Sequence, residues 1–155
     1  MKKFVLLLCL SLLGACVSSN AQQHNLGPIE PAVLLAEHRA FAEEYGAYIP
    51  AESAKNVVSA LQGKRLIVIF GTWCHDSQRE VARLLKILDV ANMPVEIDLL
   101  AVDRNKQDPD GIAERMGLVY TPTIYVYSGN KELGRIIERP SVSLEQDLAE
   151  ILRRE

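Results

Sequence analysis

The apolar run LIVIF at residues 66–70 is followed by a glycine, a cysteine and a helical pattern. A continuous run rich in β-branched residues predicts a strand that is buried on both faces of a sheet. The helical pattern after Cys74 is carried by Val81, Leu84, Leu85 and Leu88. VEIDLLAV at residues 95–102 then predicts a second strand. Because a helical crossover joins the two strands, we expect them to lie parallel with a right-handed connection.

Further helices and strands are expected on either side of this unit. Before it, the spacing of apolar residues predicts a helix over residues 31–46 and a shorter one over residues 52–62. After it we expect a short helix within 108–117, a hairpin of strands at 123–127 and 132–138, and a terminal helix started by a capping box of Ser143 and Gln146. The order from residue 66 is β-α-β-α-β-β-α, which predicts an α/β fold with a mixed sheet covered by helices.

The N-terminus has the pattern of an export signal. Two lysines precede the apolar run FVLLLCLSLL at residues 4–13, which small residues follow. Such a run is too short for a spanning helix. LGAC at residues 13–16 resembles a bacterial lipobox, which implies that residues 1–15 are removed and that Cys16 carries lipid. Residues 16–30 would then be the lipidated cysteine and a polar tether. The alternative is ordinary cleavage, which would give a free secreted protein.

The lipobox resemblance implies a location in the bacterial cell envelope, with the domain facing the periplasm and held to a membrane by its acyl chains. Each buried methylene group contributes roughly 0.8 kcal/mol to such anchoring. Val17, rather than an aspartate, follows Cys16. The absence of an aspartate at this position resembles lipoproteins that are sorted to the outer membrane. The formal net charge of -3, with no cluster of lysines and arginines, gives no reason to expect nucleic acid as a partner.

Signal removal and lipidation would leave a single thiol. Cys9 would leave with the signal and Cys16 would be modified, so only Cys74 remains. An exported domain lies where disulfides persist, yet this one has no partner cysteine for an internal bridge. An unpaired cysteine in such a protein is a candidate for a reactive thiol or for intermolecular pairing.

Two motifs resemble the thioredoxin-like superfamily, WCHDS at residues 73–77 and YTPT at residues 120–123. The resemblance implies a three-layer sandwich over residues 31–155, with the family core at 52–155 and an N-terminal helical extension. It also implies that Pro122 is a cis-proline lying against Cys74, and that Thr121 contacts the substrate backbone.

The sequence departs from dithiol members of the superfamily at two positions. Ser77 replaces the second cysteine, which makes the chain resemble a monothiol member. Val68 stands where thioredoxins have a buried acid.

The neighbours of Cys74 should tune its reactivity. A thiol is nucleophilic as thiolate, and a free cysteine titrates near about pH 8.5. The start of a helix favours the anion, and so would protonated His75 and a hydrogen bond from the Ser77 hydroxyl. Asp76 opposes the anion by its own charge. We expect a modest net lowering of the Cys74 pKa, with Trp73 packed beside the site.

The presence of one thiol limits the chemistry of the site. A thiolate attacks a disulfide to form a mixed disulfide, and a second thiol must then resolve it. With Ser77 in the second position, Cys74 as nucleophile supports exchange with exported protein thiols or disulfides, or with low-molecular-weight thiols, but no complete dithiol cycle. The chain is therefore a possible monothiol oxidoreductase or isomerase that needs no cofactor.

Two other functions stay open. One is a redox-inactive scaffold or binding module on a thioredoxin-like frame, with Cys74 left over. The other, less favoured, is metal handling. A metal site would join Cys74 and His75 to a distant ligand, and no histidine or cysteine follows His75 in the chain.

Overall fold

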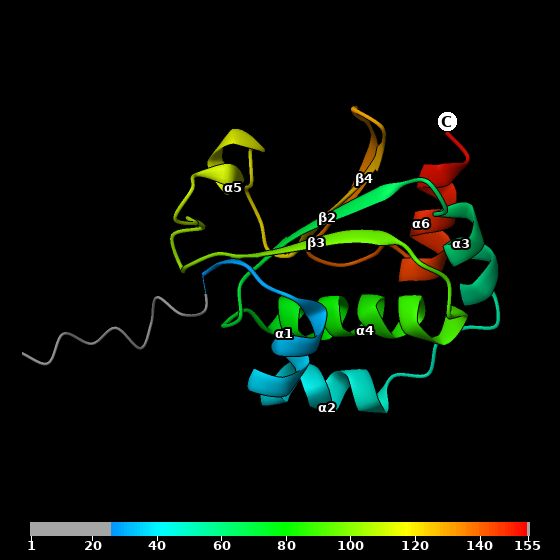
Figure 1. Ribbon diagram of the computed structural model, residues 1–155, viewed down its shortest axis with the longest axis horizontal. Helices are drawn as coiled ribbons and strands as arrows, with labels where there is room; N and C mark the ends of the chain where they lie inside the picture. Colours follow the sequence, from blue (N-terminus) through cyan, green and yellow to red (C-terminus); the bar gives the residue numbers. More distant parts are fainter. Residues whose placement is uncertain (1–25, 155) are drawn as a thin grey trace, which may run out of the picture.

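The computed structural model of the chain describes residues 26–154. It is built around a five-stranded mixed sheet, whose central strands are labelled in Figure 1. The strands lie in the order β1-β3-β2-β4-β5. Their bounds are β1 Gly27–Pro28, β2 Arg65–Phe70, β3 Glu96–Ala101, β4 Thr123–Ser128 and β5 Lys131–Ile137. β2 and β3 are parallel, as the crossover predicts, and every other neighbouring pair is antiparallel.

The helices cover the two faces of the sheet unequally. Their bounds are α1 Pro31–Glu37, α2 Arg39–Ala47, α3 Ala54–Ala60, α4 His75–Ala91, α5 Ile112–Arg115 and α6 Leu144–Leu152. α4 lies along one face, and α1 and α2 lie on the far side of α4 (Figure 1). The larger core cluster joins α2, α3, α4 and α6 to this face, while the smaller one packs α5 against the other. These layers confirm the predicted α/β sandwich with its mixed sheet and flanking helices.

The prediction of a single helix over residues 31–46 is wrong, because the chain forms two helices that meet at His38. The backbone of His38 is extended, with φ -118° and ψ 93°. Its N–H donates to the Leu34 carbonyl and closes α1, while its carbonyl accepts from the Phe41 N–H and opens α2. No glycine or proline marks this break.

The start of the described chain also differs from prediction. Gly27 and Pro28, which the sequence assigned to the tether, form β1 and pair antiparallel with β3. Ile29 continues this pairing by donating its N–H to the Leu99 carbonyl at 3.0 Å. Cys16 and the predicted signal lie outside the described residues. Within residues 26–154 no helix is long and apolar enough to span a bilayer.

The predictions for the two helices that follow β3 have different outcomes. α5 is much shorter than the predicted range of 108–117, and it begins only after Gly111, whose φ is 66°. α6 begins as predicted, since the Ser143 hydroxyl accepts from the Gln146 N–H at 3.2 Å. The hairpin of β4 and β5 is confirmed.

Candidate thiol site

Cys74 lies between the end of β2 and the first turn of α4. It is the N-cap of α4, a helix of 17 residues, and its own backbone is extended. A turn fixes it there, because its N–H donates to the Gly71 carbonyl at 3.0 Å and its carbonyl accepts from the Gln78 N–H at 2.9 Å. The thiol is half-buried. The sulfur therefore faces the unpaired N–H groups at the start of a long helix.

The proline loop meets the thiol from the neighbouring strand. The peptide bond between Thr121 and Pro122 is cis. β4 follows this loop and pairs with β2, placing Thr123 opposite Ile69. The Cys74 thiol donates to the Thr121 carbonyl, with 3.2 Å between sulfur and oxygen. The structure thus brings the two sequence motifs together, as the resemblance implied.

The loop is held on its other side by two further hydrogen bonds. The Thr123 hydroxyl donates to the Tyr120 carbonyl at 2.8 Å. The Glu138 N–H, just past the end of β5, donates to the Pro122 carbonyl at 2.7 Å. Both ends of the loop are therefore fixed against the sheet, which keeps the Thr121 carbonyl over the sulfur.

Opposing influences act on the pKa of Cys74. Burial is the largest and raises it, but hydrogen bonds from the Ser77 and Thr121 side chains and from the N–H groups of Ser77 and Asp76 outweigh burial. The pKa is lowered overall, in the direction expected from the sequence. The S–H bond to the Thr121 carbonyl acts against this lowering, because only the neutral thiol can donate it.

Ser77 connects the strand end to the sulfur. Its side chain is fully buried, and its hydroxyl oxygen accepts from the Gly71 N–H at 3.2 Å. Because that contact uses a lone pair, the hydroxyl proton is available for Cys74. This bond to the sulfur is one of the causes of the lowered thiol pKa. The residue that replaces the second cysteine is thus placed to stabilise a thiolate.

The charge of Asp76 is compensated by two arginines that the sequence patterns did not predict. The Arg79 guanidinium lies 2.9 Å from its carboxylate and the Arg139 guanidinium lies 3.9 Å from it. Arg79 also pairs with the buried Glu80 at 2.6 Å. The opposition to a thiolate that the sequence assigned to Asp76 is correspondingly weakened. The spacing of Asp76 and Arg79 by three residues was the available signal.

His75 and Trp73 occupy different surroundings. His75 is exposed on the first turn of α4 and lines a shallow depression between α4 and α2. The Trp73 indole N–H donates to the Val102 carbonyl at 3.2 Å, and the Arg104 guanidinium lies 5.2 Å from the ring centre. The Trp73 indole is thus held against the residue that follows β3. Val68 is fully buried within β2.

The Trp73 ring explains the glycine that follows β2. A Cβ at Gly71 would lie 2.6 Å from Cε2 of the ring, closer than packed atoms come. We expect Gly71→Ala to displace the ring and lower the free energy of unfolding by about 1–3 kcal/mol.

Urea unfolding followed by fluorescence of the chain's one tryptophan, Trp73, measures this effect. Gly46→Ala in α2 is the matched control, because no atom lies within 4 Å of its added Cβ. That change should leave the free energy of unfolding unchanged or raise it by up to about 1 kcal/mol. Equal stabilities of the two variants would contradict the packing of Trp73 on Gly71.

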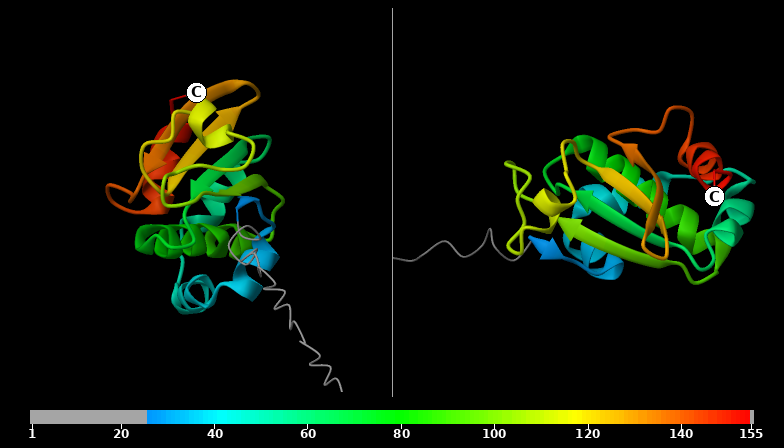
Figure 2. Two further views of the ribbon diagram at one scale, coloured as in Figure 1. Left: turned by 90° about the vertical axis from the view of Figure 1, so that its left-hand side faces the viewer. Right: turned by 90° about the horizontal axis from the view of Figure 1, so that it is seen from above.

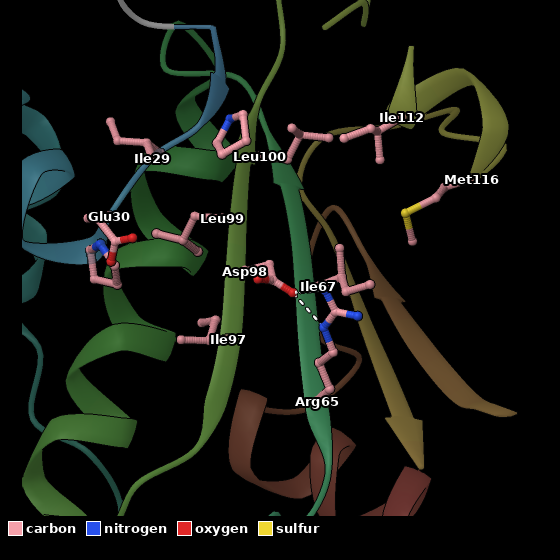
Figure 3. A pocket seen from close by; sticks show the side chains of 12 residues that line it. Ile29, Glu30, Arg65, Ile67, Ile97, Asp98, Leu99, Leu100, Ile112 and Met116 are labelled. Carbon is pink, nitrogen blue, oxygen red and sulfur yellow. Dashed lines mark hydrogen bonds and ion pairs between the residues drawn. The ribbon is translucent and has the colours of Figure 1, made fainter. Parts of the chain in front are cut away.

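A separate hollow lies on the sheet face that α5 covers only in part (Figure 3). Its volume is about 290 Å³, and apolar side chains such as Ile67, Leu100 and Met116 line it. The ion pair of Arg65 with Asp98, 2.6 Å from Nε to Oδ2, lies within it. The thiol does not line this hollow, so it is no part of the candidate site. Among residues 26–154 no group of three or more histidine, cysteine or acidic side chains is arranged to hold a metal ion.

Comparison with solved structures finds similar chains at low sequence identity. A crystal structure of an HIV epitope scaffold is 20% identical with a TM-score of 0.56, covering 88% of this chain and 97% of that one. A Pseudomonas aeruginosa protein of unknown function is 19% identical with a TM-score of 0.52, covering 88% and 96%. A thioredoxin from Aeropyrum pernix is 14% identical with a TM-score of 0.44, covering 84% and 94%. No protein-family model and no curated protein matches the chain.

The fold is thioredoxin-like. The strand order, the cysteine at the start of α4 and the cis-proline before β4 give the chain this architecture. At such identities the likeness concerns the fold alone. A fold hosts many functions, so function is inferred from the geometry around Cys74.

Proposed function

We propose that the chain is an exported, lipid-anchored protein that performs thiol–disulfide exchange through Cys74. The observation that carries the proposal is the position of the sulfur, at the start of α4 and 3.2 Å from the carbonyl that precedes the cis-proline. Residues 1–15 would be removed, Cys16 would carry the lipid, and the domain would face the periplasm of a bacterial cell envelope.

The exchange step conserves electrons. The Cys74 thiolate attacks one sulfur of a partner disulfide, and a new bond forms between the two sulfurs as the old bond breaks. The partner's other sulfur leaves as a thiolate and takes a proton from solvent. Because Ser77 cannot resolve the mixed disulfide, a second thiol from the partner or from a small molecule must release Cys74.

Three side chains or groups have assigned roles in this step. The Ser77 hydroxyl stabilises the thiolate before attack and the returning thiolate after release. When Cys74 ionises, the Thr121 carbonyl loses its S–H donor and becomes free to accept an N–H from the partner backbone. Tyr120 is half-exposed next to this carbonyl and offers an apolar surface to the partner.

One observation favours a second candidate, a binding module with an inert thiol. The same bond from the Cys74 thiol to the Thr121 carbonyl stabilises the neutral sulfur. If the neutral form dominated, the apolar surface beside the cis-proline would serve binding alone.

Reaction with glutathione disulfide at neutral pH separates the two candidates. The chain without residues 1–16 contains Cys74 as its one thiol. We expect the folded chain to form the mixed disulfide faster than the same chain in urea, as followed by mass spectrometry, since the fold raises the thiolate fraction. Cys74→Ser should form none. A thiol that reacts only after unfolding would favour the binding module.

A further inference from the structure

The chain enters the fold at the same edge of the sheet as the thiol. We call this the thiol edge, formed by the ends of β2 and β3 at Phe70 and Ala101 and by the start of β4 at Thr123. Gly27 of β1 pairs with Ala101, and Ala101 pairs with Phe70. β1, drawn in blue, runs antiparallel to β3, so its first residue, Gly27, lies at the thiol edge (Figure 2).

A short series of contacts joins this entry point to the site. The Val102 N–H, next to Ala101, donates to the Phe70 carbonyl at 2.8 Å. The Val102 carbonyl in turn accepts from the Trp73 indole N–H at 3.2 Å. Neighbouring strands lie about 5 Å apart, so β1 and the end of β2 are separated by roughly 10 Å. The entry point and Cys74 therefore share one end of the molecule.

We infer that the anchored protein holds its thiol edge toward the bilayer, so that Cys74 exchanges with thiols and disulfides of proteins held at the same membrane. The inference rests on the lipid anchor of the proposed function. It specifies which end of the anchored domain faces the bilayer. It also predicts that Cys74 reacts with membrane-held partners in preference to freely diffusing ones.

The length of the connecting segment supports this orientation. Ten residue steps separate Cys16 from Leu26. Whatever its conformation, such a segment spans at most roughly 35 Å. The opposite end of the sheet lies about 20 Å from the thiol edge, the length of a six-residue strand. A short connection at one end raises the effective concentration of that end at the surface above that of the other.

Two reporter cysteines in a Cys74→Ser background test the orientation without relying on Cys74 chemistry. Val119→Cys, at a side chain 61% exposed, lies two residues before Thr121 at the thiol edge. Asn130→Cys lies in the exposed turn of the hairpin, at the opposite end of the sheet.

The full lipidated chain is placed in phosphatidylcholine vesicles that carry a pyridyl-disulfide phosphatidylethanolamine. Attack by a reporter thiolate joins it to the lipid and releases pyridine-2-thione, which absorbance follows. Each rate is divided by the rate of the same variant with soluble dithiodipyridine, which removes differences in intrinsic reactivity.

We expect the normalised rate of Val119→Cys to exceed that of Asn130→Cys by at least about threefold. An insertion of roughly twenty glycine and serine residues after Asn20 should reduce this ratio. Equal rates, a faster Asn130→Cys, or a chain without lipid at Cys16 would overturn the inference.

The reaction of unmodified Cys74 with soluble dithiodipyridine separately tests the exchange function. A reactive Cys74 with equal reporter rates overturns the orientation alone. An unreactive Cys74 with the expected ratio supports the orientation while contradicting exchange.

Discussion

Ser77→Cys should turn the chain into a catalyst of insulin reduction by dithiothreitol, with a rate at least about tenfold above that of the unchanged chain. Ser77 is buried beside the sulfur of Cys74, and its hydroxyl bonds to it. A thiol at the same position would resolve the mixed disulfide within the molecule, where the reaction gains from proximity. The precipitation of reduced insulin, followed by turbidity, measures the rate.

Two control variants distinguish the effect of a correctly placed pair of thiols from the effect of the individual substitutions. Ser77→Ala keeps the single thiol and should show no gain. Cys74→Ser combined with Ser77→Cys keeps one thiol in the second position and should also show none. A Ser77→Cys chain that folds but stays inert would mean that positions 74 and 77 do not have the geometry of a redox pair.

Phe41→Ala should lower the free energy of unfolding by about 3–5 kcal/mol, although Phe41 lies in the N-terminal extension. Its side chain is fully buried, and its ring meets the ring of Phe70 edge to face, with 5.6 Å between the centres. Phe70 is the last residue of β2, so the extension supports the strand from which the thiol loop departs. Urea unfolding of the chain without residues 1–16 measures the change.

Ile49→Ala is the matched control within the extension, because this side chain is 88% exposed. Its effect should stay within about 0.5 kcal/mol. If Phe41→Ala cost no more than Ile49→Ala, residues 31–47 would be an appendage to the folding unit. The family core assigned to residues 52–155 would then be sufficient for stability.

The parts of the fold that the sequence predicts well are those with strong local patterns. LIVIF at residues 66–70 is fully apolar because β2 is the central strand, with Leu66, Val68 and Phe70 buried on one face and Ile69 on the other. Ile67 is half-buried, since it lines the hollow that α5 leaves open. The crossover through α4 then required β2 and β3 to be parallel. The proline loop was predicted from the motif YTPT at residues 120–123, and the hydrogen bond from the Cys74 thiol to the Thr121 carbonyl agrees with its expected position.

The parts that escaped prediction depend on contacts between distant residues. The break at His38 has no local marker and reflects the packing of α1 and α2 against α4 and the sheet. β1 has only two residues, too few for a pattern, and exists through pairing with β3. The compensation of Asp76 by Arg139 joins residues 63 positions apart, so no spacing rule reveals it.

The dependence of Cys74 alkylation on pH measures whether the fold activates the thiol for exchange. The chain without residues 1–16 is reacted with iodoacetamide across a range of pH, beside a peptide of residues 70–80 that has the same local sequence without the fold. Because the fold lowers the Cys74 pKa, the midpoint for the folded chain should lie at lower pH than that of the peptide, and Ser77→Ala should move it back upward. A midpoint at or above that of the peptide would mean that burial outweighs the hydrogen bonds to sulfur, and it would contradict exchange through Cys74.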